Sequence, residues 1–223
     1  DSIIEKILIK INLLVEKRIS LINHLITKSF DSKNTTKDSG LEWASDIPHD
    51  WEILPLKQIF LECFGGSWGD EPYYEQEENL VNVIRVTEFN YEELNVINEI
   101  PTIRSLNIEK SLKKLIKEDD IILEKSGGGE KTPVGRAVLV EKKYNFLTVN
   151  SNFTNVLRIN PEKVLPKFCV YLLNSFYNGG MTKRNIKQTT GIQNLDLNSF
   201  MSEKIFIPSL KEQRLITNKL DSE

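Results

Sequence analysis

Residues 119–140 read "DDIILEKSGGGEKTPVGRAVLV" and consist of two apolar runs joined by a glycine-rich segment. Glycines followed by a lysine and a threonine suggest a loop that binds nucleotide phosphates. Such a loop needs a glycine directly before the lysine and a helix directly after it. Here Glu130 separates Gly129 from Lys131, and Pro133 disfavours helix in the residue before it. Because the second run alternates and is rich in valine, the stretch predicts a β-hairpin and excludes a nucleotide site.

Further strands and a helix are predicted on both sides of this hairpin. Runs rich in Val, Ile and Phe predict strands at residues 81–86, 153–159 and 204–210. Residues 165–177, "LPKFCVYLLNSFY", read as a helix with Pro166 in its first turn. Residues 181–195, "MTKRNIKQTTGIQNL", read as a long polar loop. This succession of elements predicts a mixed α/β fold.

Both ends of the chain have the pattern of amphipathic helices. Ser2 and Glu5 have the spacing of a capping box, and apolar residues then recur at helical spacing as far as residue 29. Ser209 and Glu212 open a second helix in the same way. A helix over residues 2–29 is about 42 Å long, too long for one small domain to cover. We therefore predict that the helices pair, within the chain or with a partner, through Ile4, Ile7, Leu8, Ile11, Leu14, Val15, Ile22, Leu25, Leu215, Ile216 and Leu220.

The ends of these patterns divide the chain into four parts. The segment "DSKNTTKDSG" is polar and has no periodicity, so it is predicted to be a linker. A mixed domain begins at Trp51 and ends before the second capping box. The predicted organisation is a helix at 1–30, a linker at 31–50, a domain at 51–208 and the start of a second helix at 209–223.

Composition excludes several classes of protein. With 39% hydrophobic and 27% charged residues, the chain of 223 residues is not of the disordered type. No apolar run approaches the roughly 18 to 20 residues of a membrane span. Glu5, Lys6 and Lys10 interrupt the apolar N-terminus, unlike a signal peptide. Cys63 and Cys169 indicate neither a disulfide framework nor a metal site. We expect a cytoplasmic protein with no membrane contact, metal or cofactor.

Charge is distributed unevenly along the chain. Residues 126–195 hold ten Lys or Arg and three acidic residues, a net charge of +7, so the remainder carries −10 to give the overall −3. This asymmetry is typical of a protein with one basic face that binds a polyanion. The alternative, lysines scattered over a solvated surface, stays open at this point.

The aromatic residues fall into two groups. Those in apolar surroundings are expected in the core: Trp43, Trp51, Phe168 and Tyr171. In "GGSWGDEPYY", by contrast, Trp68, Tyr73 and Tyr74 lie among glycines in a loop. We expect Trp68 to pack locally, while the two tyrosines could pack locally or face a nucleic acid.

One catalytic pattern has to be weighed. Asp120 followed by Glu141 and Lys143 fits a loose D…E-x-K spacing, in which two carboxylates hold Mg²⁺ and a lysine assists the attacking water. The hairpin at 119–140 places Asp120 and Glu141 at the same end of paired strands, so geometry allows the site. The pattern is short and arises by chance in charged sequences. A Mg²⁺-dependent nuclease is therefore an alternative function.

Four segments, in this order, resemble the DNA specificity subunit of type I restriction–modification systems. They are residues 38–59, 67–72, 119–140 and 189–220. The last is the most specific, because it pairs "GIQNL" with the helix opening "IPSLKEQRLI". The family often has a second proline where this chain has Ser209. The resemblance covers roughly residues 37–223.

The resemblance implies a fold, a function and partners. The family's subunit has two target-recognition domains separated by two long antiparallel helices, and each domain reads one half of a split DNA site. This chain has the size of one repeat, with a twisted mixed sheet at 51–208, loops that face DNA, and conserved spacer helices at 1–30 and 209–223. The subunit has no catalysis of its own. The implied partners are double-stranded DNA, DNA adenine methyltransferase (modification) subunits, a restriction/translocase subunit and a second copy of the chain.

Two further alternatives belong to other classes. The chain could be the target-recognition domain of a single-chain restriction–methylation enzyme. It could also be a protein-interaction module held by its helices, with no DNA role. Salt-insensitive or absent DNA binding would favour the interaction module.

The most basic loop is the predicted DNA contact. Residues 182–193 carry three cations and no acidic residue. Lysines there would meet phosphates, whereas guanidinium and amide groups could read base edges bidentately. The predicted contacts are Lys183, Arg184, Lys187, Gln188, Thr190 and Gln193, with Lys131 and Arg136 of the glycine hairpin in second rank. The alternative is that Thr189, Thr190 and Gln193 only satisfy the loop backbone.

Overall fold

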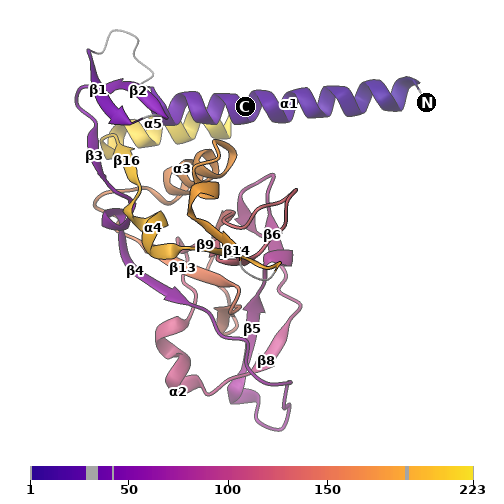
Figure 1. Ribbon diagram of the computed structural model, residues 1–223. Helices are drawn as coiled ribbons and strands as arrows, with labels where there is room; N and C mark the ends of the chain where they lie inside the picture. Colours follow the sequence, from indigo (N-terminus) through magenta and orange to yellow (C-terminus); the bar gives the residue numbers. More distant parts are fainter. Residues whose placement is uncertain (1, 29–34, 42, 189–190, 223) are drawn as a thin grey trace.

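A long helix and a mixed α/β domain make up the computed structural model, which describes residues 2–28, 35–41, 43–188 and 191–222. Helix α1 (Ser2–Thr27) lies along one end of the domain, and its N-terminal half projects beyond it (Figure 1). Helix α5 (Leu210–Asp221) lies beside the other half of α1 and runs in the opposite direction (Figure 1). Both terminal helices predicted from the sequence are therefore present.

The central sheet has six strands and is mixed, as predicted. Only β11 and β7 pair in parallel, and the other four pairings are antiparallel. The glycine-rich hairpin is confirmed, because Leu123 lies opposite Ala137 and Ile121 opposite Leu139. In sheet order, the strands are β4 (Phe60–Gly65), β13 (Thr154–Ile159), β9 (Ile121–Glu124), β11 (Ala137–Leu139), β7 (Asn95–Val96) and β6 (Phe89–Asn90).

Smaller sheets and short helices complete the domain. A three-stranded sheet contains β12 (Thr148–Asn150), β5 (Leu80–Ile84) and β8 (Ile103–Ser105). Another contains β10 (Ser126–Gly127), β15 (Gln193–Leu195) and β14 (Ile186–Gln188). A two-stranded sheet joins β16 (Lys204–Ile207) to β3 (Glu52–Pro55). The short helices are η1 (Leu56–Ile59), η2 (Glu77–Asn79), η3 (Val86–Glu88), α2 (Ile108–Ser111), η4 (Leu112–Lys114), η5 (Thr182–Asn185) and α4 (Leu197–Ser202).

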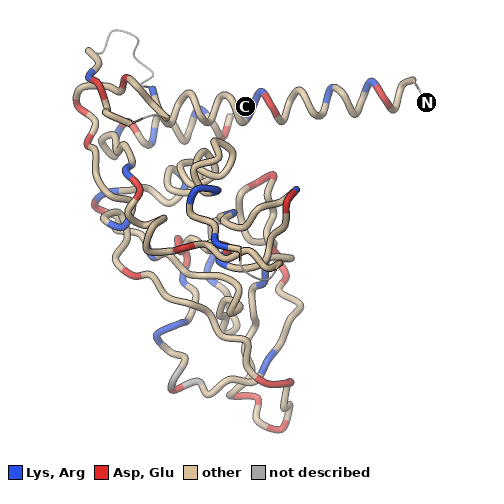
Figure 2. The backbone as a smooth tube through the Cα atoms, in the orientation of Figure 1, with Lys and Arg blue, Asp and Glu red and all other residues tan. Residues whose placement is uncertain are grey.

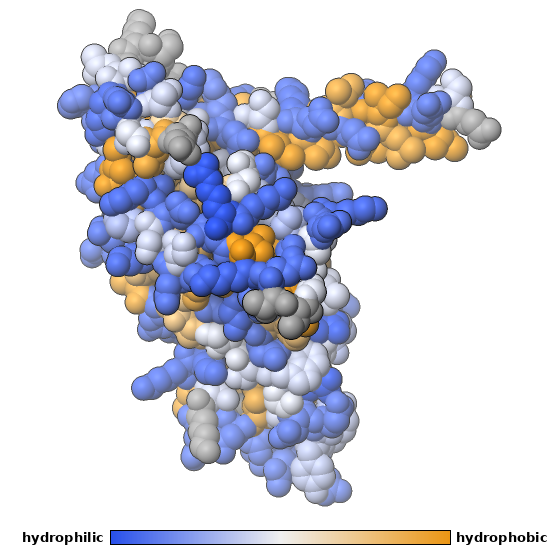
Figure 3. Space-filling view, in the orientation of Figure 1, coloured by the Kyte–Doolittle hydropathy of each residue, from blue (hydrophilic) through white to orange (hydrophobic). Residues whose placement is uncertain are grey.

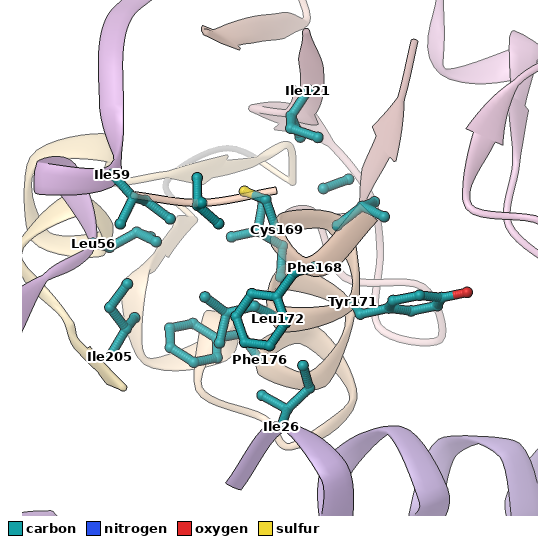
Figure 4. Packing of buried hydrophobic residues seen from close by; sticks show 14 of the residues in the cluster. Ile26, Leu56, Ile59, Ile121, Phe168, Cys169, Tyr171, Leu172, Phe176 and Ile205 are labelled. Carbon is teal, nitrogen blue, oxygen red and sulfur yellow. The ribbon is translucent and has the colours of Figure 1, made fainter. Parts of the chain in front are cut away.

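Helix α3 (Pro166–Asn178) lies at the centre of the core, with Pro166 at its first position as expected. One side of α3 packs on β9 and β11, and another contacts α1 and α5. Phe168 and Phe176 of this helix meet Ile26 of α1 in one apolar cluster (Figure 4). Trp43 stacks on Phe206 with ring centroids 4.4 Å apart. The terminal helices are therefore attached to the domain through α3.

Two predicted irregular segments contain strands. Within the predicted linker at 31–50, β1 (Thr36–Leu41) and β2 (Ala44–Pro48) form an antiparallel hairpin, although residues 31–34 and 42 lie outside the described residues. The hairpin was not predicted because its strands are polar. Most of their residues are exposed or half-buried, whereas Ile47 is fully buried. The segment predicted as a long polar loop contains η5 and the β14–β15 hairpin.

Within the described residues, no helix combines the length and apolar character needed to cross a membrane.

Candidate nucleic-acid interface

The glycine hairpin lies beside residues 182–188 and 191–195 of the basic segment. Strand β10 pairs antiparallel with β15, which places Gly127 opposite Gln193, and β15 pairs in turn with β14. The hydroxyl of Ser126 also donates to Oδ1 of Asn194, at 2.7 Å. Two segments that lie far apart in the sequence therefore share a three-stranded sheet, and this places β14 and β15 beside the glycine hairpin.

The glycines of the hairpin serve close internal packing. Gly128 has φ +63°, and a Cβ there would come 2.5 Å from the backbone nitrogen of Val134. Gly135 has φ +110°, and a Cβ there would come 2.2 Å from the side-chain methyl of Thr182. L side chains rarely adopt such backbone angles, and the close neighbours leave no space for one. These glycines allow the hairpin to fold back and to seat against η5.

Four of the predicted contacts are exposed on this surface: Lys131, Lys183, Arg184 and Gln188. Lys187 is also exposed, and its ammonium contacts Oδ2 of Asp196 at 2.6 Å. This lysine and backbone N–H groups at the start of α4 lower the pKa of the Asp196 carboxyl. Exposed ion pairs of this kind contribute little to stability, so Lys187 can exchange its partner for a phosphate. Thr190 lies outside the described residues.

Gln193 has a structural contact, which argues against the base-reading role predicted for it. Only 7% of its surface is exposed, and its Oε1 accepts the backbone N–H of Val134 at 3.1 Å. Its amide nitrogen faces Oε1 of Gln188 at 3.4 Å. The side chain thus satisfies the backbone of the glycine hairpin, which is the alternative that the sequence left open.

Arg136 is likewise held inside the domain and does not stand free beside DNA. Its Nε and Nη2 donate to the two carboxylate oxygens of Glu124 at 2.9 and 3.1 Å. Its guanidinium carbon lies 4.2 Å from the centre of the Tyr91 ring. A carboxylate that is 2% exposed needs such a partner, because an unpaired buried charge is costly. This internal ion pair argues against the second-rank DNA contact predicted at Arg136.

The positive charge counted over residues 126–195 does not collect on one free face. Besides Arg136, Arg158 contacts Oδ1 of Asp120 at 2.9 Å and Oε2 of Glu62 at 2.6 Å. Figure 2 shows basic residues at segment 182–188 and at scattered points elsewhere, with acidic residues gathered at the end remote from α1. The count along the sequence therefore overestimates the basic surface. The exposed cations of residues 126–195 are Lys131, Lys142, Lys143, Lys183, Arg184 and Lys187, and three of them lie in segment 182–188.

The residues of the alternative nuclease pattern do not form a metal site. Asp120 is 1% exposed, and its carboxylate accepts from Arg158 and from the backbone N–H of Lys117. Glu141 instead contacts Asn95 and Lys167. Across the part of the chain that the structure describes, no group of three or more His, Cys, Asp or Glu could hold a metal ion. Asp120 is an internal counter-ion of Arg158.

A hollow of about 570 Å³ adjoins the glycine hairpin, and no pattern in the sequence predicted it. Its wall comes from four separate segments: Trp68, residues 85–87, residues 124–136 and residues 151–153. Trp68 is 37% exposed, and the Arg104 guanidinium lies 4.6 Å from its ring centre, so it packs locally and also lines the hollow. The sequence did not decide whether Tyr73 and Tyr74 pack locally or face a nucleic acid. Their side chains are 50% and 65% exposed.

The chain is similar to known proteins in sequence and in fold. A family model described as "Type I restriction modification DNA specificity domain" matches residues 48–222. A Methanocaldococcus jannaschii protein, assigned as the specificity subunit of the type I restriction enzyme MjaX, is 23% identical over 175 residues. That match spans 78% of this chain and 40% of the relative.

Two solved structures share the fold over 99% of this chain. The HsdS subunit from Thermoanaerobacter tengcongensis has a TM-score of 0.54 at 16% identity, and the match covers 47% of that chain. A structure that concerns complex assembly and conformational transition of the type I R-M system has a TM-score of 0.55 at 13% identity, covering 48% of that chain. The chain thus spans about half the length of the relatives that it matches.

Proposed function

We propose that this chain recognises one half of a split DNA site. The proposal proceeds from its family, because the chain belongs to the type I restriction–modification DNA specificity family. The DNA contact is located by the exposed basic segment 182–188, which the β10–β15–β14 sheet holds beside the glycine hairpin. The side of the molecule in Figure 3 is largely hydrophilic, with small apolar patches on the domain and a longer apolar stretch along the projecting part of α1. The domain is then the DNA reader, and the terminal helices are the parts that join it to an assembly.

In this proposal the chain performs no chemistry itself. It positions DNA adenine methyltransferase subunits and a restriction/translocase subunit on the site that it reads, and a second copy of the chain supplies the other half-site. The family match and the solved relative that concerns complex assembly support these partners. The single-chain enzyme is not favoured, because the matched relatives are described as specificity subunits.

The proposal is tested by DNA binding across a salt series. Lys183→Ala and Lys187→Ala should each weaken binding to every duplex and flatten the plot of log K against log salt by about one unit, since each lysine releases one phosphate counterion. Fluorescence anisotropy with a labelled duplex of mixed sequence measures both effects. Lys211→Ala, an exposed lysine on α5, is the control and should leave the slope unchanged.

Two results would contradict the proposal at different points. A wild-type chain whose DNA binding is absent or insensitive to salt would favour a protein-interaction module. Salt-sensitive binding with wild-type slopes in both Lys183→Ala and Lys187→Ala would keep the DNA role and move the DNA face away from segment 182–188.

A further inference from the structure

The hollow beside the glycine hairpin has walls fixed by the backbone. Lys125 donates its N–H to the carbonyl of Phe153 at 2.8 Å, and Ser151 donates to that of Ile84 at 2.8 Å. Gly66 lies so close to the 150–151 carbonyls that a Cβ there would approach them to 2.1 Å. The hollow is therefore a built feature at the ends of several strands, and side chains that line it have defined positions.

Arg85 lines this hollow on a turn that fixes its side chain. Its Nε and Nη2 donate to the two carboxylate oxygens of Glu88 at 3.2 and 2.7 Å. Glu88 is 2% exposed, and it also accepts from the hydroxyl of Thr87 and the backbone N–H of Arg85. The carboxylate thus accepts from four donors, all on residues 85–87. It thereby holds the guanidinium of Arg85 in one position at the surface.

The contact with Glu88 leaves the recognition edge of the guanidinium available. Glu88 uses the side edge, made by Nε and one proton of Nη2, so the end edge keeps donors on both Nη1 and Nη2. Two parallel donors match the O6 and N7 acceptors that guanine presents in the major groove. The side chain of Arg85 is 38% exposed, whereas that of the similarly paired Arg136 is 19% exposed. Arg85 is therefore the more accessible of the two held guanidinium groups.

The hollow also continues the surface proposed to meet the DNA backbone. Gly127 and Gly128 line it, and Gly127 pairs with Gln193 in the sheet that carries Lys187. Phe153 at its wall is 47% exposed, an apolar group of the kind that contacts the thymine methyl. A duplex whose phosphates contact segment 182–188 would bring its base edges toward a neighbouring site with one fixed cation and one apolar side chain.

We infer that Arg85 is a specificity-determining residue, which reads one guanine of the half-site bidentately, and that Glu88 is its positioning residue. This inference rests on the proposed DNA role and goes beyond it by naming a base and the group that reads it. Positive charge alone does not suffice, because a lysine at the same place cannot offer two parallel donors in a fixed plane.

The test is selection of bound sequences from a pool of duplexes with a randomised segment. The double variant Arg85→Met/Glu88→Gln keeps the net charge and leaves no lone buried carboxylate. It should lose the guanine preference at one position and bind the wild-type selected duplex about 5- to 150-fold more weakly. Its affinity for a scrambled duplex should be unchanged. Replacing that guanine by 7-deazaguanine, which lacks the N7 acceptor, should weaken wild-type binding and leave the double variant unaffected.

Controls separate this inference from the proposed function. Lys183→Ala should select the same sequence as wild type with lower affinity for all duplexes. Should the double variant fail to fold by circular dichroism, Arg85→Lys, which keeps a cation for Glu88, should show the same loss of guanine preference. The role of Arg85 is overturned if a folded variant selects the same sequence as wild type, or if the wild-type selection contains no guanine. Neither result contradicts the half-site proposal. A wild-type chain that selects no sequence overturns the half-site proposal, and this inference with it.

Discussion

Gln213, in the family-like opening "IPSLKEQRLI", fastens α5 to the domain with its amide. The side chain is fully buried, and its Oε1 accepts the backbone N–H of Leu165 at 2.8 Å. Its amide nitrogen donates to the carbonyls of Lys163 and Pro208, both at 2.9 Å. The neighbouring Glu212 accepts from the indole of Trp51 at 3.0 Å. The motif that identifies the family in the sequence is thus a structural joint between helix and domain.

Gln213→Leu should lower the free energy of unfolding by about 1–3 kcal/mol, because backbone groups at the buried joint lose their partner. Urea denaturation followed by circular dichroism gives the difference. Gln58→Leu, the same change at an exposed glutamine of η1, should stay within about 0.5 kcal/mol of wild type. Equal stability of the two variants would show that the joint contributes little.

Single residues of the candidate site were predictable only where local pattern decides their environment. The exposure of Lys183 and Lys187 was predictable because a stretch with cations and no carboxylate is exposed in most folds. The burial of Gln193 was not predictable, since its backbone partner lies 59 positions away, at Val134. Arg85 was missed because it follows "VNVI" in a run that reads simply as a strand, and Glu88 holds it through a turn that propensity does not reveal.

Among the elements, α1 consists of two parts with different environments. Near its C-terminal end, Ile22, Leu25 and Ile26 are at most 4% exposed and pack in the domain core. Toward its N-terminus, Ile11 is 49% exposed and Val15 is 52% exposed. One apolar stripe predicted the helix correctly, but periodicity does not tell which part the domain covers.

Ile26→Ala should therefore destabilise the domain by about 2–5 kcal/mol, the usual cost of a cavity at a fully buried isoleucine. Ile11→Ala is the matched control and should change the free energy of unfolding of the monomer by less than about 0.5 kcal/mol. Urea titrations at low protein concentration make the comparison. A similar loss in both variants would mean that the N-terminal half of α1 also packs on the domain.

Elements joined by short connections were predictable, and so was the antiparallel approach of α1 and α5, but the long-range pairing in the small sheet was not. The β9–β11 hairpin and α3 follow from local signals, namely glycine tips, Val and Ile runs and a first-turn proline. The β10–β15 pairing joins residues 126–127 to 193–194, and no feature of either segment specifies the other. Leu215, which was predicted to pair within the chain or with a partner, is 54% exposed in the single chain.

For the assembly of the protein, the decisive feature is the uncovered part of α1. A helix of 26 residues is about 39 Å long, and roughly half of it projects beyond the domain (Figure 1). The predicted pairing residues on this half are between 49% and 63% exposed: Ile4, Ile7, Leu8, Ile11, Leu14 and Val15. A hollow of about 540 Å³ lies beneath it, between α1, the 91–94 segment and the end of α3. An apolar surface of this kind indicates an interface.

We expect a second copy of the chain to cover this surface, helix against helix, which would place two DNA-reading domains in one particle. Ile11→Lys should then shift a concentration-dependent dimer to monomer in sedimentation equilibrium, because a lysine ammonium would have to be buried between apolar stripes. Lys10→Ala, at the adjacent exposed position, should leave the association unchanged. Should wild type and Ile11→Lys both sediment as monomers at all concentrations, this surface must pair with a different chain, and two domains would not be joined through α1.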